Sequence, residues 1–114
     1  MKSLTNEEKI EILLEAQKYM NSKENCGKIK DSMCFSIDRI IDKKYKTNIL
    51  IIHVNKYIPE FNIGNITSLS EKYNFKKPEP NIKKYEGYWW STVKKFDRKN
   101  RNICFDALIT ELSK

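Results

Sequence analysis

The sequence predicts a mainly α-helical protein, with a single domain over residues 1–114 that holds four to five helices and with one short strand pair left open. Two observations lead to this fold class. Apolar residues recur three or four positions apart in several separate stretches, which is the spacing of helices that bury one face. The 114-residue length supports one hydrophobic core, and the apolar residues are too regularly patterned for a disordered chain.

The first expected helix begins at a capping box. Thr5 and Glu8 have the required spacing: the Thr5 side chain can accept from the backbone amide of Glu8, and the Glu8 side chain from the backbone amide of Thr5. The helix is expected to end at Asn21 and Ser22. Its apolar positions are Ile10, Ile12, Leu13, Leu14, Ala16 and Met20.

A second helix is expected from about Lys28 to Lys43, and a last one that begins near Asp97 or Asn100. The apolar stripe of the second helix consists of Ile29, Met33, Ile37, Ile40 and Ile41. That of the last helix consists of Phe105, Leu108, Ile109 and Leu112. Both stripes have helical spacing, so both helices are predicted to pack one face on the core.

The run Ile49–Val54 is ambiguous. Its β-branched residues favour a buried strand, whereas its length without alternation favours a buried helix. We prefer a helix that begins near Thr47 or Asn48, because no second strand is available to pair with a strand here. Pro59 ends the element in either case.

The region after Pro59 has the weakest pattern. A short helix is expected to start at Asn65 or Thr67 and to end near Tyr73. Residues 76–80, with the sequence Lys-Lys-Pro-Glu-Pro, are typical of an extended connector, because proline neither donates a backbone hydrogen bond nor continues a helix.

Positive charge is concentrated in one segment. The net charge is +7, and residues 72–101 contain ten basic and three acidic residues, while the rest of the chain is nearly balanced. A local excess of this kind attracts anions, whereas evenly scattered lysines mainly promote solubility.

An aromatic cluster, Tyr85–Trp90, lies inside this basic segment and contains both tryptophans. An aromatic ring can stack on a nucleotide base for about 1–3 kcal/mol, and a guanidinium can hold a phosphate with two parallel hydrogen bonds. The candidate ligand-binding residues are Tyr88, Trp89, Trp90, Lys94, Lys95, Arg98 and Arg101. We expect Arg98 and Arg101 to share one face of the last helix. The alternative is structural: rings that cover the core, and arginines that pair with the N-terminal glutamates.

No catalytic residue, cofactor or metal site is predicted. His53 is the single histidine and lies in an apolar run, and Cys26, Cys34 and Cys104 lack the spacing of metal ligands. An odd number of cysteines without a CxxC pair indicates reduced thiols, with Cys34 and Cys104 in the core. No apolar run approaches the roughly 20 residues of a membrane span, so we expect a cytoplasmic protein.

Three short motifs resemble small uncharacterised phage and prophage proteins. They are Ser32-Met33-Cys34-Phe35 after Gly27, Ile58-Pro59-Glu60, and Tyr88-Trp89-Trp90 followed by arginine and Leu-Ile. In those proteins a Leu-Cys step, a Phe-Pro-Glu step and a Tyr-Trp-Trp ending recur. This chain departs from them with methionine before Cys34 and a longer, more basic stretch after Trp90. The resemblance implies a counter-defence protein.

The function expected from these observations is non-enzymatic. The chain would be a phage protein in the cytoplasm of the bacterial host that sequesters an anionic nucleotide signal of host immunity, as a sponge. Sponges commonly place their sites between protomers, so a homo-oligomer is expected. The alternatives are an anti-CRISPR-like inhibitor that docks on a host defence protein through its basic aromatic face, and a small nucleic-acid-binding module. No helix-turn-helix signature supports the last.

Overall fold

A computed structural model describes residues 3–22, 33–46, 54–76 and 98–114. Within these ranges the chain forms five helices and no strand, so the predicted mainly α-helical fold class is confirmed. The helices are α1 (Asn6–Asn21), α2 (Met33–Tyr45), α3 (Val54–Tyr57), α4 (Ile63–Lys72) and α6 (Arg98–Leu112). None of these described helices combines the length and apolar character that crossing a membrane requires.

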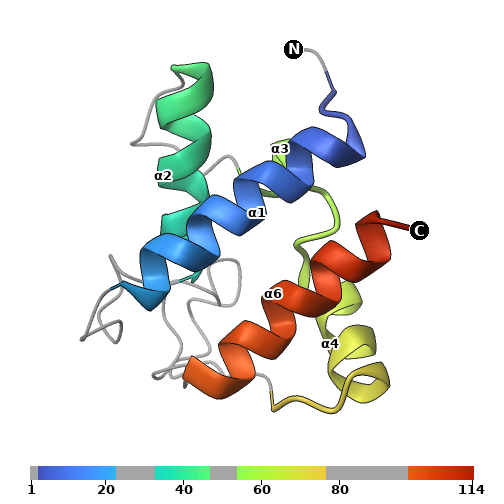
Figure 1. The fold of residues 1–114 in the computed structure, drawn as a ribbon. Coiled ribbons are helices and arrows are strands. Elements are labelled where there is room, and N and C mark those ends of the chain that lie inside the picture. The colour runs from blue at the N-terminus through green and yellow to red at the C-terminus, as the bar shows by residue number, and fades with distance from the viewer. Residues whose placement is uncertain (1–2, 23–32, 47–53, 77–97) are drawn as a thin grey trace, which may run out of the picture.

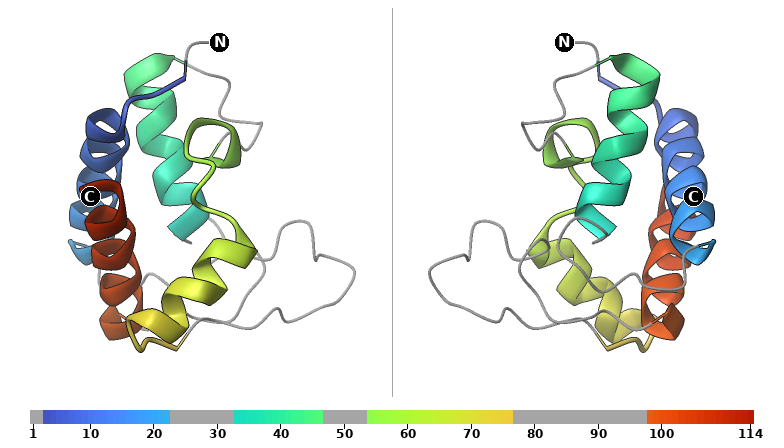
Figure 2. Two further views of the ribbon diagram at one scale, coloured as in Figure 1. Left: turned by 90° about the vertical axis from the view of Figure 1, so that its right-hand side faces the viewer. Right: turned by 90° about the vertical axis from the view of Figure 1, so that its left-hand side faces the viewer.

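The helices form two layers. Figure 2 shows α1 and α6 side by side in one layer, and α2, α3 and α4 in the other. Helix α1 contacts both α2 and α6, so it lies at the centre of the packing (Figure 1). The ion pair between Lys44 and Glu11, at 3.1 Å, and the contact between Arg39 and Tyr19 show that α1 and α2 run in roughly opposite directions.

Amide and carboxylate side chains join α1 to α6. The amide of Gln17 donates to Asp106 at 3.0 Å, and the amide of Asn21 donates to Asn102 at 2.9 Å. The later residue of α1 meets the earlier residue of α6, so these two helices are also antiparallel. The first and last described helices are therefore direct neighbours.

One hydrophobic core lies between the two layers, and most of the predicted apolar positions contribute to it. The buried ones are Ile12, Leu13, Ala16 and Met20 on α1, Met33, Ile37, Ile40 and Ile41 on α2, and Phe105, Leu108 and Leu112 on α6. Leu14 differs, because half of its surface is exposed. One residue advances a helix by about 100°, so the position after buried Leu13 turns away from the core.

The capping box of α1 is confirmed. The Thr5 hydroxyl accepts from the Glu8 amide at 3.1 Å, and the Glu8 carboxylate accepts from the Thr5 amide at 3.0 Å. Helix α1 ends at Asn21, as predicted. Both partners of each bond are close in sequence, which is why the pattern alone identifies this helix start.

Helix α4 begins earlier than predicted. Its N-cap is Asn62, whose side-chain oxygen accepts from the Asn65 amide at 2.9 Å, rather than Asn65 or Thr67. Gly64 leaves room beside this cap, because a Cβ there would lie 3.3 Å from the capping oxygen, a tight contact. Of the ambiguous run, only Val54 is described, and it begins the short helix α3; residues 49–53 lie outside the described ranges.

Candidate functional site

The predicted ligand-binding residues fall into two groups. Tyr88, Trp89, Trp90, Lys94 and Lys95 lie outside the described residues, as do Cys26 and His53. Arg98 and Arg101 are described, and both belong to the first half of α6.

The two arginines of α6 occupy different environments. Arg98 is exposed on the first turn, whereas Arg101 is only 2% exposed. Three residues advance a helix by about 300°, so side chains three positions apart point in directions about 60° from each other. On α6 the boundary between the exposed and the buried face lies between Arg98 and Arg101. The expectation that both share one ligand-facing surface is therefore not met by this arrangement.

Arg101 packs against the end of α1. Its Nη2 donates to the side-chain oxygen of Asn21 at 3.2 Å. The last turn of a helix carries unsatisfied carbonyls and a partial negative charge, so this is a favourable place for a guanidinium. The contact lies at the opposite end of α1 from the glutamates that the structural alternative named.

The third arginine, Arg39, lies on α2 and packs against Tyr19 of α1. Its Nη1 donates to the tyrosine hydroxyl, and its guanidinium carbon lies 5.3 Å from the ring centroid. A cation over an aromatic face is attracted by the ring quadrupole. The contact also fixes the direction of a long side chain. Sequence analysis did not select this pair, because no local pattern links residues that lie twenty positions apart.

Arg39 and Arg101 contact Tyr19 and Asn21 in the last part of α1, and Arg98 lies one turn before Arg101 on α6; we call this region the arginine end (Arg39, Arg98 and Arg101). Figure 1 shows that α1 ends, and α2 and α6 begin, on the same side of the molecule. The first turns of α2 and α6 contribute partial positive charge there, and the last turn of α1 contributes a partial negative charge that Arg101 meets.

The two flanks of the predicted aromatic and basic segment are joined at this end. The backbone amide of Lys76 donates to the side-chain oxygen of Asn100 at 2.8 Å. The chain therefore leaves the described core and returns to it at the first turn of α6, next to Arg98. Both attachment points of residues 77–97 belong to the arginine end.

A second charged cluster lies at the other end of α6. The carboxylate of Glu111 accepts from Lys72 at 3.1 Å and from the Tyr73 hydroxyl at 2.5 Å, and pairs with Lys114 at 2.8 Å. Hydrogen bonds from Lys114, Tyr73 and Lys72 lower the pKa of Glu111 from 4.5 to about 2. This cluster joins the end of α4 to the end of α6.

The described part of the chain offers little for metal or thiol chemistry. No group of three or more His, Cys, Asp or Glu side chains among the described residues could hold a metal ion. Cys104 is fully buried, and desolvation raises the pKa of its thiol, so it packs in the core as predicted.

No protein-family model, curated protein or solved structure matches this chain. The function is therefore inferred from the residues of the chain itself.

Proposed function

We propose that the protein binds an anionic nucleotide at the arginine end and holds it without chemical change. The observation that carries this proposal is the position of Arg39, Arg98 and Arg101 at the arginine end, where the predicted aromatic segment is also attached. Guanidinium groups are the side chains best suited to phosphates, since each can donate two parallel hydrogen bonds.

Each arginine has a distinct role in this proposal. Arg98 is exposed and makes the first contact with phosphate. Arg39, held in place by Tyr19, supplies a second guanidinium whose direction is already fixed, so that less side-chain entropy is lost on binding. Arg101 is a positioning residue, because it is buried and holds the end of α1 against α6.

The undescribed segment supplies the remaining contacts. Tyr88, Trp89 or Trp90 stacks on the base, and Lys94 and Lys95 add positive charge around the phosphates. In biological terms the protein is a phage counter-defence sponge that removes a nucleotide signal of host immunity, and it acts as a homo-oligomer. The resemblance to phage proteins and the localised positive charge support this role.

A nucleotide panel tests the proposal. Linear and cyclic nucleotides, ADP-ribose derivatives and short DNA are added to the purified protein, and the unfolding temperature is measured. A ligand that binds only the folded state raises this temperature. We expect one small nucleotide to do so, and to be recovered chemically intact after heating.

Two single variants assign the site. Arg98→Ala removes an exposed, charge-assisted contact and should weaken nucleotide binding about 10- to 100-fold. Lys43→Ala removes an exposed cation from the far end of α2 and should leave binding unchanged. Equal binding by both variants would place the site elsewhere.

The other outcomes contradict the proposal in distinct ways. Binding to DNA with log K falling by about 0.9 per contacted phosphate for each tenfold rise in salt would indicate the nucleic-acid module. No shift with any nucleotide, together with a stable complex with one host defence protein, would indicate the docking inhibitor.

A further inference from the structure

A pocket of ≈ 100 Å³ lies between the segment before α1 and the turn after α3. It is lined by Ser3, Leu4, Lys9, Lys56, Tyr57 and Pro59. We call it the α1–α3 pocket. It lies near the start of α1, whereas the arginine end lies where α1 ends, so the two sites are separate (Figure 1).

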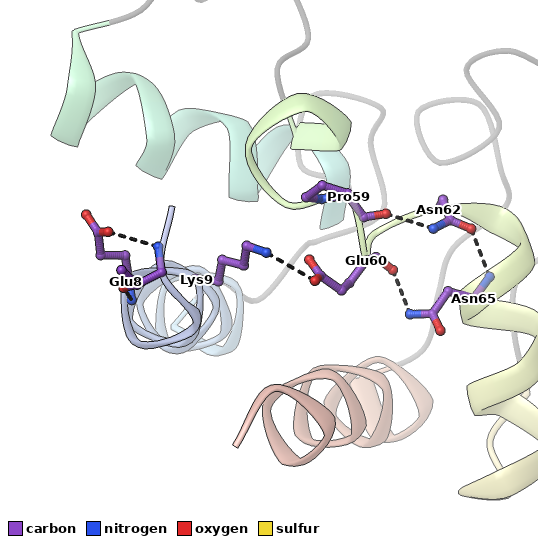
Figure 3. Close-up of polar contacts among 7 residues, drawn as sticks. Glu8, Lys9, Pro59, Glu60, Asn62 and Asn65 are labelled. Carbon is purple, nitrogen blue, oxygen red and sulfur yellow. Dashed lines mark hydrogen bonds and ion pairs between the residues drawn. The ribbon is translucent and has the colours of Figure 1, made fainter. Parts of the chain in front are cut away.

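The turn that forms one wall of the α1–α3 pocket is held by side-chain hydrogen bonds. The amide of Asn62 donates to the carbonyl of Pro59 at 2.7 Å, and the amide of Asn65 donates to the carbonyl of Glu60 at 2.8 Å (Figure 3). Each bond joins a side-chain amide to a backbone carbonyl three or five residues earlier in the chain. The position of Pro59 in the pocket wall is therefore fixed before any ligand arrives.

The other wall is fixed as well. Leu4 packs against the hydrophobic core, and the capping box of Thr5 and Glu8 follows it at once. Tyr57 is 9% exposed, and its ring is stacked on that of Tyr45 with centroids 5.7 Å apart. A pocket with fixed walls loses little conformational entropy when it binds a ligand.

The charges in the α1–α3 pocket do not cancel. The Lys9 side chain is 12% exposed and its ammonium is paired with Glu60 at 3.1 Å, across the gap between α1 and the turn (Figure 3). Lys56 is exposed and makes no ion pair within the described part of the chain. Among the described residues, Lys56 therefore brings a positive charge to the pocket that no carboxylate balances.

We propose that the α1–α3 pocket binds a small monocarboxylate with a short apolar tail. The carboxylate pairs with Lys56, and the tail lies against Leu4, Tyr57 and Pro59. The size limits the ligand, because a cavity of about 150 Å³ just accommodates benzene and nucleotides need several times more space. The charge also limits it, since Lys9 and Glu60 form a neutral pair and Lys56 alone can balance a single negative charge.

The proposal is tested by NMR titration of the full chain with butyrate, butylammonium and inorganic phosphate. We expect butyrate to produce saturable shifts at the amides of Ser3, Leu4, Lys9, Lys56 and Tyr57, and butylammonium, which has a similar tail and opposite charge, to produce none. Phosphate should bind more weakly than butyrate. Shifts with butylammonium, or tighter binding of phosphate, would overturn the assignment.

Two variants test the role of Lys56. Lys56→Ala should weaken butyrate binding about tenfold, the effect of losing one charge-assisted hydrogen bond. Lys18→Ala removes an exposed cation from the other end of α1 and should bind butyrate as the unmodified chain does. No saturable butyrate shift in the unmodified chain, or equal affinity in the two variants, would also refute the proposal.

Discussion

Replacing the buried Arg101 with alanine should destabilise the fold by about 3 kcal/mol, whereas the same change at exposed Arg98 should cost less than about 0.5 kcal/mol. The two residues have the same side chain and lie one turn apart on α6. Any difference between the two variants therefore reports their environments.

The magnitude follows from what Arg101 contributes. Alanine removes two methylene groups from a side chain that is 2% exposed, at about 0.8 kcal/mol each. It also removes the hydrogen bond to Asn21, and a bond to a charged group contributes about 1.5 kcal/mol or more after desolvation is counted. Methionine keeps the apolar stem, so Arg101→Met should cost only about half as much.

Urea denaturation monitored by circular dichroism measures these free energies of unfolding. With an m-value near 2 kcal/mol per molar, Arg101→Ala should lower the midpoint by roughly 1.5 M, and Arg98→Ala by less than about 0.3 M. The m-values should match, which shows that the variants differ in stability rather than in the surface exposed on unfolding.

The reasoning would be refuted if Arg101→Ala were as stable as Arg98→Ala, because the Arg101 guanidinium would then be solvated rather than packed against α1. The expected result also bears on the binding assay. A protein with both arginines replaced would be destabilised by about 3 kcal/mol, so a loss of binding there would mix stability with contact, and Arg98→Ala is the informative variant.

Three further predictions concern stability. The pKa of the Glu111 carboxylate is lowered from 4.5 to about 2, so this group should stabilise the fold fully above pH 4.5 and progressively less as the pH falls through about 2. Glu111→Gln should therefore have a lower urea midpoint than the unmodified chain at pH 7, and the difference should shrink between pH 4.5 and about pH 2. Asn62→Ala and Thr5→Ala each remove a helix N-cap and should cost about 1 kcal/mol in the same assay, a result contradicted if neither changes the midpoint. Phe61→Ala empties a fully buried site and should cost about 3–5 kcal/mol, and a loss below 1 kcal/mol would mean that this ring is not packed in the core.

The features that sequence analysis predicted are those whose partners are close in the chain. The capping box of Thr5 and Glu8 spans three residues, and the buried stripes of α2 and α6 follow from helical spacing. The predicted start of α4 is Asn65 or Thr67, whereas the cap is Asn62. Several asparagine and threonine residues in this stretch can cap a helix, and only the fold shows which of them does so.

The candidate site was only partly predictable, because it depends on contacts between distant residues. Arg98 was selected from its place in a basic segment, and it is exposed. The burial of Arg101 depends on the end of α1, 80 residues earlier in the chain. The pairing of Arg39 with Tyr19 likewise requires α2 to fold back along α1, which helical periodicity does not encode.

The pairing of the first helix with the last has a consequence for synthesis of the protein. Gln17 finds its partner 89 residues later, in a helix that ends at Leu112. At about 5–20 residues per second, the apolar face of α1 waits several seconds on the ribosome with α2 but without α6. Closing so long a loop is slow compared with forming either helix, so the core is completed only once α6 has been synthesised. Protection of the apolar face of α1 during this interval is therefore expected to favour correct folding.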